Sequence, residues 1–338
     1  MRGIEEPNVS NWLAAHVEGA VAPFEYHLIA GGRSNLTYRV VDAAGTVYVL
    51  RRPPLGHVLA TAHDMAREHK LMAAVGKTPV PVPRMLALCE DPAVNGAPFY
   101  VMSYVAGTVM DSLDKAASLP VELRRTAAFD LIDVLAELHA ADIDAIGLGD
   151  LARREGYIER QLKRWTTQWQ NSKTRELAAM DEVVAALTSR VPEQKDVAIV
   201  HGDYRFGNVL TNTETGRIAA VLDWELCTLG DPLADVGYLG IYWARDDQRL
   251  VSNDPSAAPG FPSYDELVAR YAERTGRDVS QIEYYVAFSY WRLAVISEGV
   301  YARYLNGAMG EQDIDLTVMK GSVEHLVASA LAAVRRLG

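Results

Sequence analysis

The spacing of apolar positions changes several times along the first hundred residues. Residues 8–20 carry apolar side chains at helical spacing and predict a short amphipathic helix, with Asn8 or Ser10 as its N-cap. Short runs rich in β-branched and aromatic residues, typical of strands, lie at 24–30, 36–42, 46–52, 84–90 and 99–105. The first three runs follow one another across short turns and predict an antiparallel meander. A helix at 61–75 separates them from the last two.

Beyond Gly107 the pattern becomes mainly helical. Apolar residues within 121–141 keep to one face of a long helix. Further helices are predicted as two segments within 155–190 and at about 232–243, 264–276, 281–305 and 313–336. Short β-rich runs interrupt them at 198–203, 208–212 and 217–225. The last two of these runs predict a hairpin, and the aperiodic stretch 246–263 predicts a long loop.

Together these elements predict an α+β chain with two lobes. Residues 1–105 would form a small N-lobe with an antiparallel sheet, and residues 106–338 a larger, mostly helical C-lobe. A chain of 338 residues with 49% hydrophobic content is long enough to bury a core in each lobe. Ligand-binding clefts are common at such junctions, so we expect the functional site between the lobes.

The charge balance narrows the range of partners. The chain has 33 Lys and Arg against 44 Asp and Glu, a net charge of −11, which argues against nucleic acid or an anionic membrane. Its sequence has no apolar stretch long enough to span a membrane, and its first thirty residues do not form a signal peptide. The two cysteines, Cys89 and Cys227, are too few for a disulfide scaffold or a Cys-rich zinc site. We therefore expect a cytoplasmic protein.

One group of polar residues points to a specific chemistry. His201, Asp203 and Asn208 lie in the run HGDYRFGN, and Asp223 ends an apolar run fifteen residues after Asn208. The predicted hairpin would bring Asn208 beside Asp223, and an amide oxygen with a carboxylate is a suitable partial shell for Mg²⁺. Asp203 would then accept the proton of an attacking hydroxyl. Phosphoryl transfer needs this order of groups, although each residue taken alone is equally typical of a turn.

The same residues resemble the aminoglycoside phosphotransferase and choline kinase family, which is related to the protein kinases. The resemblance rests on HGD-x-x-x-x-N at 201–208, LDWE at 222–225 and GDPLADVGY at 230–238, and it extends from about Tyr26 to the C-terminal helices. The segments GGRSNLTYRV and VLRRPP resemble a branch that also occurs fused to acyl-CoA dehydrogenases. The resemblance implies a protein-kinase-like fold, ATP and Mg²⁺ as cofactors, and a role for Asp235 in bracing the catalytic loop.

The N-lobe contains residues that this resemblance places on the nucleotide. Gly32, Ser34 and Asn35 lie in the turn between the first two strands, where glycine lets a phosphate approach the backbone. An ordinary hairpin turn is the alternative. Arg51 occupies the place of the third-strand lysine of kinases, and an arginine can bind phosphate through two hydrogen bonds. Glu68 matches the helix glutamate that pairs with this cation in kinases.

Two further positions are implied by the same resemblance. The crossing between the lobes matches the kinase hinge, so backbone groups of Ser103, Tyr104 and Val105 are expected to bind adenine. Arg205 lies two residues after Asp203, where kinases often have a lysine that contacts the transferring phosphate. A surface or structural ion pair is the alternative for Arg205.

The acceptor is not identified by these motifs. Aromatic candidates for lining its pocket are Tyr242, Trp243 and Trp291. Carboxylates that would suit a cationic acceptor are Glu225, Asp246, Asp247 and Glu298. Arginines that would suit an anionic acceptor, such as a hydroxyacyl-CoA, are Arg245, Arg292 and Arg303. The sequence leaves both classes of acceptor open.

The expected function is the ATP-dependent transfer of a phosphate to a hydroxyl of a small molecule. Asp203 and Arg205 would act in catalysis, and Asn208 and Asp223 would hold magnesium. The alternative is a nucleotide-binding pseudokinase, which Arg51 and the sparse glycines of the N-lobe turn favour. A metal-dependent hydrolase would need a second cluster of histidines, which the sequence lacks.

Overall fold

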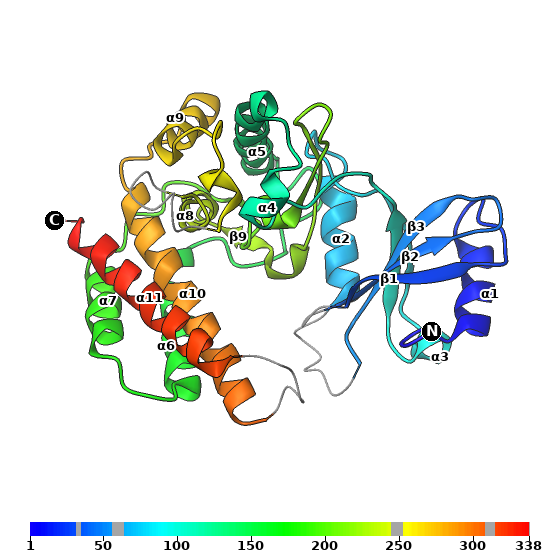
Figure 1. The fold of residues 1–338 in the computed structure, drawn as a ribbon, viewed down its shortest axis with the longest axis horizontal. Coiled ribbons are helices and arrows are strands. Elements are labelled where there is room, and N and C mark those ends of the chain that lie inside the picture. Colours follow the sequence, from blue (N-terminus) through cyan, green and yellow to red (C-terminus); the bar gives the residue numbers. More distant parts are fainter. Residues whose placement is uncertain (32–34, 56–63, 245–252, 308–314, 338) are drawn as a thin grey trace.

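A five-stranded antiparallel sheet forms the N-terminal lobe (Figure 1). The computed structural model describes residues 1–31, 35–55, 64–244, 253–307 and 315–337. The strands of the sheet are β1 (Glu25–Gly31), β2 (Leu36–Val41), β3 (Val47–Arg52), β4 (Met85–Cys89) and β5 (Phe99–Ser103). Their order is β1-β2-β3-β5-β4, and neighbouring strands are antiparallel. The first three strands therefore form the predicted meander.

Different helices bury the two faces of this sheet. They are α1 (Glu6–His16), α2 (Met65–Val75) and α3 (Pro92–Asn95). Leu50 and Val101 share a buried cluster with α1, whereas Val49 and Tyr100 share one with α2. This alternation follows from the two-residue period of a strand and directs Arg51 to the α2 face. In Figure 1, α2 stands between the sheet and the helical lobe, so this face is the one that meets the rest of the chain.

The start of α1 differs from the prediction. Glu5 is the N-cap residue and makes no capping hydrogen bond through its side chain, and Pro7 lies in the first turn. Proline is favoured there because the first helical N–H groups have no partner within the helix. Asn8 and Ser10 are therefore inside α1, and the Ser10 hydroxyl instead hydrogen-bonds the hydroxyl of Tyr26 at 2.9 Å.

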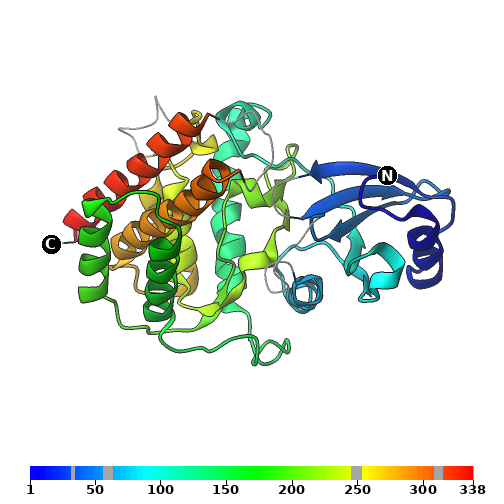
Figure 2. The same cartoon turned by 90° about the horizontal axis from the view of Figure 1, so that it is seen from below.

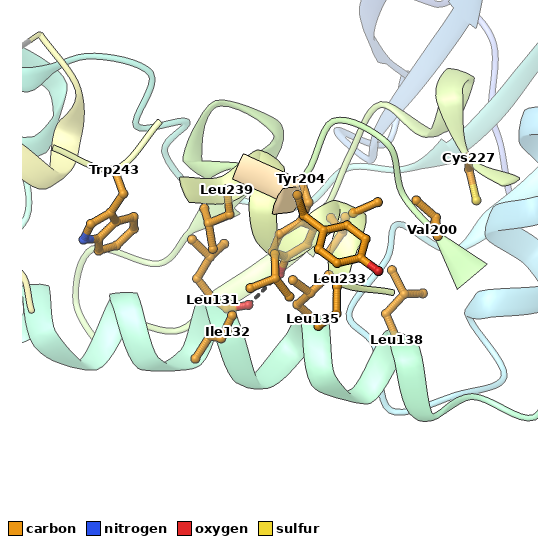
Figure 3. Packing of buried hydrophobic residues seen from close by; sticks show 14 of the residues in the cluster. Leu131, Ile132, Leu135, Leu138, Val200, Tyr204, Cys227, Leu233, Leu239 and Trp243 are labelled. Atoms are coloured by element: carbon orange, nitrogen blue, oxygen red, sulfur yellow. Dashed lines mark hydrogen bonds between the residues drawn. The ribbon is translucent and has the colours of Figure 1, made fainter. Parts of the chain in front are cut away.

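The helical lobe is built around α5. Its helices are α4 (Leu113–Ala116), α5 (Val121–Ala140), α6 (Tyr157–Ser172), α7 (Ala178–Ser189), α8 (Leu233–Ile241), α9 (Tyr264–Thr275), α10 (Ile282–Leu305) and α11 (Leu316–Arg335). Figure 3 shows Leu131, Leu135 and Leu138 of α5 packed with Tyr204, whose hydroxyl donates to the Leu131 carbonyl at 2.8 Å. The two lobes lie side by side in both views (Figures 1 and 2). None of the helices in the described ranges has the length and apolar character that crossing a membrane requires.

Two small antiparallel strand pairs lie within the helical lobe. Their strands are β6 (Ala198–Val200), β7 (Val209–Thr211), β8 (Ile218–Val221) and β9 (Thr228–Gly230). Short 3₁₀ turns are η1 (Phe206–Asn208), η2 (Trp224–Leu226) and η3 (Pro255–Ala257). The pairing of β7 with β8 confirms the predicted hairpin. β6 pairs with β9, which is too short to show a periodicity in the sequence. β6 ends earlier than predicted because Gly202, with a φ of +86°, turns the chain.

The contact between α8 and α10 depends on a glycine. A Cβ atom at Gly237 would lie 2.5 Å from the Cβ of Tyr285 and 2.6 Å from its carbonyl carbon. We expect Gly237→Ala to lower the free energy of unfolding by about 1–3 kcal/mol, because the two helices must separate. Gly321→Ala in α11 is the matched control, since a Cβ there meets nothing within 4 Å. The control should raise the stability by up to ~1 kcal/mol. Urea unfolding of both variants checks this prediction.

Candidate active site

The loop between β6 and β7 brings Asp203, Arg205 and Asn208 together. The Asn208 side-chain amide donates to the carboxylate of Asp203 at 2.7 Å and to its carbonyl oxygen at 2.8 Å. Arg205 Nε lies 3.3 Å from the other carboxylate oxygen. Asp203 is partly exposed, whereas Asn208 is buried. The loop therefore presents one oriented, partly exposed carboxylate, which is the property a general base needs.

Asp235 of α8 holds this loop in place through hydrogen bonds to its backbone. Its carboxylate accepts the backbone N–H groups of His201 at 2.6 Å and Gly202 at 2.8 Å. Burial alone would raise the pKa of Asp235, but His139, the electrostatic effect of His201 and the backbone N–H of Gly202 lower it below its usual value. Asp235 thus stays ionised inside the protein, and the geometry agrees with the bracing role that the resemblance implies.

His139 of α5 extends this brace, a role that the sequence did not reveal. Its Nε2 lies 3.3 Å from Asp235, and its Nδ1 lies 2.7 Å from the hydroxyl of Tyr271 on α9. A neutral ring satisfies both contacts, with Nε2–H donating to Asp235 and Nδ1 accepting from Tyr271. No local pattern indicates this role, because the two partners lie 96 and 132 residues further along the chain.

Burial lowers the pKa of His139 below its ordinary value, and this predicts a pH dependence of stability. Below about pH 6.5 the unfolded chain protonates this histidine while the folded chain does not, so stability falls as the pH falls. The contribution is fully present above about pH 6.5. We expect His139→Gln, which keeps a donor for Asp235 but does not titrate, to make the melting temperature less dependent on pH between about 7.5 and 5.5. An unchanged pH dependence would contradict this assignment.

The hairpin places Asn208 next to the end of β8. The N–H of Leu222 donates to the Asn208 carbonyl at 2.8 Å, and His201 Nε2 donates to the Leu222 carbonyl at 2.9 Å. Asp223 follows with a φ of +62°, the one left-handed non-glycine residue in the described ranges. Such strain costs about 1–3 kcal/mol and is typical of functional sites. His201 is fully buried, so it links the two loops rather than facing a ligand.

Arg51 connects the sheet to this hairpin. Its Nη2 donates to Asp223 at 2.7 Å, and its Nε lies 3.3 Å from Glu68 Oε2 without the alignment of a hydrogen bond. Burial alone would lower the pKa of Arg51, but its acidic neighbours raise it above its ordinary value. Glu68 is held in turn by the hydroxyl of Tyr100 at 2.9 Å. A permanently charged guanidinium therefore lies at the junction of the two lobes.

Asn35 is the one residue of the predicted phosphate-binding set Gly32, Ser34 and Asn35 that the structure describes. Gly32 and Ser34 lie outside the described residues. Asn35 is buried, and its side-chain NH₂ group donates to Glu68 Oε1 at 3.1 Å. The side-chain oxygen, Oδ1, has no hydrogen-bond partner. Asn35 thus supports the Glu68 carboxylate, a contact that was not predicted. Burial raises the pKa of Glu68, and the Arg51 guanidinium opposes this rise.

The predicted hinge follows the end of β5. The Ser103 N–H donates to the Arg84 carbonyl and its hydroxyl accepts the Arg84 N–H, both at 2.9 Å, so Ser103 is still part of the sheet. Tyr104 is 45% exposed. In the described part of the chain, the N–H of Val105 has no hydrogen-bond partner. A backbone donor is therefore left at the crossing where adenine binding is expected.

The oxygen donors of Asn208 and Asp223 suit a magnesium ion. Mg²⁺ commonly takes one or two protein oxygens and completes its shell with water and substrate phosphates. Among the described residues, no three His, Cys, Asp or Glu side chains form a metal-binding group. The donor set therefore fits an ion that arrives with its phosphate ligand and does not fit a permanently bound structural metal.

The candidate acceptor residues are divided between the surface and the core. Arg205 lies over the ring of Tyr242, 4.8 Å from its centre, and both border a small hollow together with Trp243. Trp291 is buried in the core. Glu298 is buried and bound to Arg175 and Thr174, so it is not available to a cationic acceptor. Arg245, Asp246 and Asp247 lie outside the described residues.

Comparison with known proteins places this geometry in a family. Residues 25–282 match the model of the phosphotransferase enzyme family, APH. The chain is 35% identical over 310 residues to acyl-CoA dehydrogenase family member 10 of Mus musculus, covering 89% of this chain and 28% of that protein. It is 34% identical over 330 residues to family member 11 of Gallus gallus, covering 94% of this chain and 41% of that protein. The chain thus spans less than half the length of these relatives.

Solved structures show the same fold over nearly the whole chain. A Ralstonia eutropha protein assigned as an aminoglycoside phosphotransferase has a TM-score of 0.83 at 32% identity, with 98% of both chains covered. An aminoglycoside 2′-phosphotransferase solved with GDP has a TM-score of 0.64 at 15% identity, covering 96% of this chain and 99% of that one, which shows the fold alone. Since its sequence match and its fold match agree, this chain belongs to the phosphotransferase enzyme family and has the two-lobed, protein-kinase-like fold.

Proposed function

We propose that this chain transfers the γ-phosphate of ATP to a hydroxyl group of a small molecule. One observation carries the proposal: the Asp203–Asn208 pair and the Arg51–Asp223 pair meet where the two lobes join. A base, a set of oxygen donors and a fixed cation are the parts that phosphoryl transfer requires. Membership of the phosphotransferase family supports the same reaction class.

In the proposed step, Asp203 orients the acceptor hydroxyl and takes its proton. The hydroxyl oxygen forms a bond to the γ-phosphorus as the bond from that phosphorus to the bridging oxygen breaks, and ADP leaves. Asn208 fixes one oxygen of the Asp203 carboxylate and thereby its direction. Arg205, whose pKa is raised by Asp203 despite its burial, remains charged beside the transferring phosphate.

The nucleotide would be held by both lobes. Arg51, steadied by Glu68, would bind phosphate oxygens, and backbone groups of Ser103, Tyr104 and Val105 would bind adenine. Gly32 and Ser34 would approach the phosphates from the predicted turn. Magnesium held by Asn208 and Asp223 would neutralise phosphate charge when it is bound. Arg51, the hinge backbone and the turn residues would act through their own charge and hydrogen-bond donors.

The acceptor is proposed from chemistry and from the names of relatives. Relatives at 34–35% identity are named acyl-CoA dehydrogenase family members, and a structural relative is assigned as an aminoglycoside phosphotransferase. A hydroxyacyl-CoA or another hydroxylated metabolite is therefore the acceptor class that we favour. We also propose that the protein acts in the cytoplasm, that the N-lobe ends at residue 105 and that the C-lobe begins at residue 106.

Thermal unfolding with Mg·ATP, Mg·GTP and Mg²⁺ alone tests the nucleotide site. Mg·ATP at a hundred times its Kd should stabilise the chain by ~2.7 kcal/mol, whereas Mg²⁺ alone should have little effect. ADP release with a panel of hydroxylated compounds then tests transfer. Stabilisation by Mg·ATP without turnover of any compound would favour the pseudokinase, and no stabilisation by either nucleotide would reject the nucleotide site itself.

A further inference from the structure

A cavity of about 440 Å³ lies between α2, α6, α10 and residues 225–228. Three arginines, one from each helix, form part of its wall: Arg67, Arg164 and Arg292. Trp165 and Leu226, the latter 39% exposed, add apolar surface. This concentration of cationic groups stands out in a chain whose net charge is −11. Arginine is the side chain best suited to bind a carboxylate or a phosphate through parallel hydrogen bonds.

Arg292 is the strongest indication that the cavity takes an anion. It is only 5% exposed, and its Nη2 donates to the carbonyl oxygen of Gly202 at 2.6 Å. Its Nε is buried without a hydrogen-bond partner, and its guanidinium lies 4.5 Å from the centre of the Tyr238 ring. In the ranges that the structure covers, no carboxylate lies within ion-pair distance of Arg292. A buried guanidinium is costly unless a counter-charge balances it.

The other two arginines also lack an acidic partner among the described residues. Arg67 donates to the carbonyl oxygen of Cys227 at 2.5 Å, and Arg164 is exposed and lies over the ring of Trp165. The cavity wall also contains three carboxylates, those of Asp64, Glu68 and Glu225. Glu68 is engaged by Arg51 and Tyr100 of the sheet, Asp64 caps α2 by accepting the N–H of Arg67, and Glu225 is likewise engaged in an interaction of its own.

The cavity adjoins the catalytic loop and the nucleotide side of the site. Arg292 holds the carbonyl of Gly202, the residue directly before Asp203. A Cβ atom at Gly202 would lie 2.9 Å from the carbonyl oxygen of Leu226, so the loop packs against the cavity wall backbone to backbone. Glu68 lines the cavity and is paired with Arg51. The cavity wall is therefore one contact away from both the base and the phosphate-binding cation, through Gly202 and Glu68.

We propose that this cavity binds an anionic group, a carboxylate or a phosphate, carried by the phosphate acceptor. Arg292 is the buried anchor, Arg67 and Arg164 complete the site, and Trp165 and Leu226 contact the carbon chain. The proposal rests on the proposed phosphotransfer, because it assigns the occupant as the acceptor. Binding the anion at a fixed place would hold the acceptor hydroxyl toward Asp203, which is how remote binding groups contribute to catalysis.

Titration with inorganic phosphate, followed by calorimetry at constant ionic strength, tests the anion site. We expect Arg164→Gln to weaken phosphate binding about tenfold and Arg292→Gln to weaken it at least as much. Lys163→Gln is the matched control, because Lys163 lies on the same helix, is exposed and does not line the cavity. Arg164 is exposed, so Arg164→Gln should fold even if Arg292→Gln does not. Absence of phosphate binding in the wild type, or equal binding by all variants, would overturn the site.

Matched pairs of acceptors separate a free-phosphate site from an acceptor site. The pairs are glycerate with glycerol and 3-hydroxybutyrate with 1,3-butanediol, and the readout is ADP release. Turnover of the anionic members with at least a tenfold higher kcat/KM, lost in Arg164→Gln, supports the proposal. Equal turnover of the neutral members overturns it, and phosphate binding without turnover of any member overturns the assignment of the occupant as the acceptor and leaves a free-phosphate site. Mg·ATP binding by the wild-type chain tests the proposed function separately.

Discussion

Replacing Asp203 with asparagine is expected to lower kcat by roughly 10²–10⁴-fold while leaving the Kd of Mg·ATP unchanged. The asparagine retains the size of the side chain and one oxygen that can accept the amide of Asn208, now 2.7 Å from the carboxylate. It cannot take a proton from the acceptor. Its NH₂ group would also face Arg205 Nε, which lies 3.3 Å from the second carboxylate oxygen, so some rearrangement of Arg205 is expected.

The measurement for Asp203→Asn is ADP release, with the slow hydrolysis of ATP by water as a readout that needs no acceptor. Mg·ATP affinity is measured on the same samples by thermal unfolding. Asp265→Asn is the control, since Asp265 is an exposed carboxylate in the first turn of α9, away from the loop. Retention of more than about a tenth of the activity by Asp203→Asn would remove Asp203 as the base.

Local patterns predicted much of the fold. The first three strands were predictable because each alternates apolar with polar residues or is rich in β-branched residues, and because each is bounded by a turn. Long helices such as α5 carry a clear apolar face. Short elements were harder to predict. The three residues of β9 are too few to show a hydrophobic periodicity, and the strand is defined only by its pairing with β6. The start of α1 was misplaced because proline in the first turn outweighed the usual capping residues.

The candidate site was predictable where its residues are close in sequence. Asp203 and Asn208 are five residues apart, and the hairpin places Asn208 beside the end of β8. Contacts between distant segments left no local signal. Arg51 and Asp223 are 172 residues apart, and nothing near either residue indicates that they pair. The links from Asn35 to Glu68 and from His139 to Asp235 were missed for the same reason.

The contact between Arg51 and Asp223 has a consequence for the nucleotide site. One oxygen of the Asp223 carboxylate already accepts the guanidinium at 2.7 Å. A magnesium ion at Asp223 therefore meets a carboxylate whose charge is partly balanced, and Arg51 is shared between Asp223, Glu68 and any bound phosphate. Mg²⁺ and ATP are thus expected to bind far better together than separately, because the phosphates supply the negative charge that the pair lacks.

Asp223→Asn is the sharpest test of this arrangement. Asparagine tolerates the left-handed backbone at this position, where φ is +62°, so the substitution removes the charge without adding strain. Loss of a direct carboxylate ligand should weaken Mg·ATP binding by about 100-fold, equivalent to ~2.7 kcal/mol, whereas binding of ATP without magnesium should change little. Isothermal titration with and without Mg²⁺ measures both constants. An unchanged Kd for Mg·ATP would exclude Asp223 as a metal ligand, and an equal loss with and without Mg²⁺ would instead assign its effect to the position of Arg51.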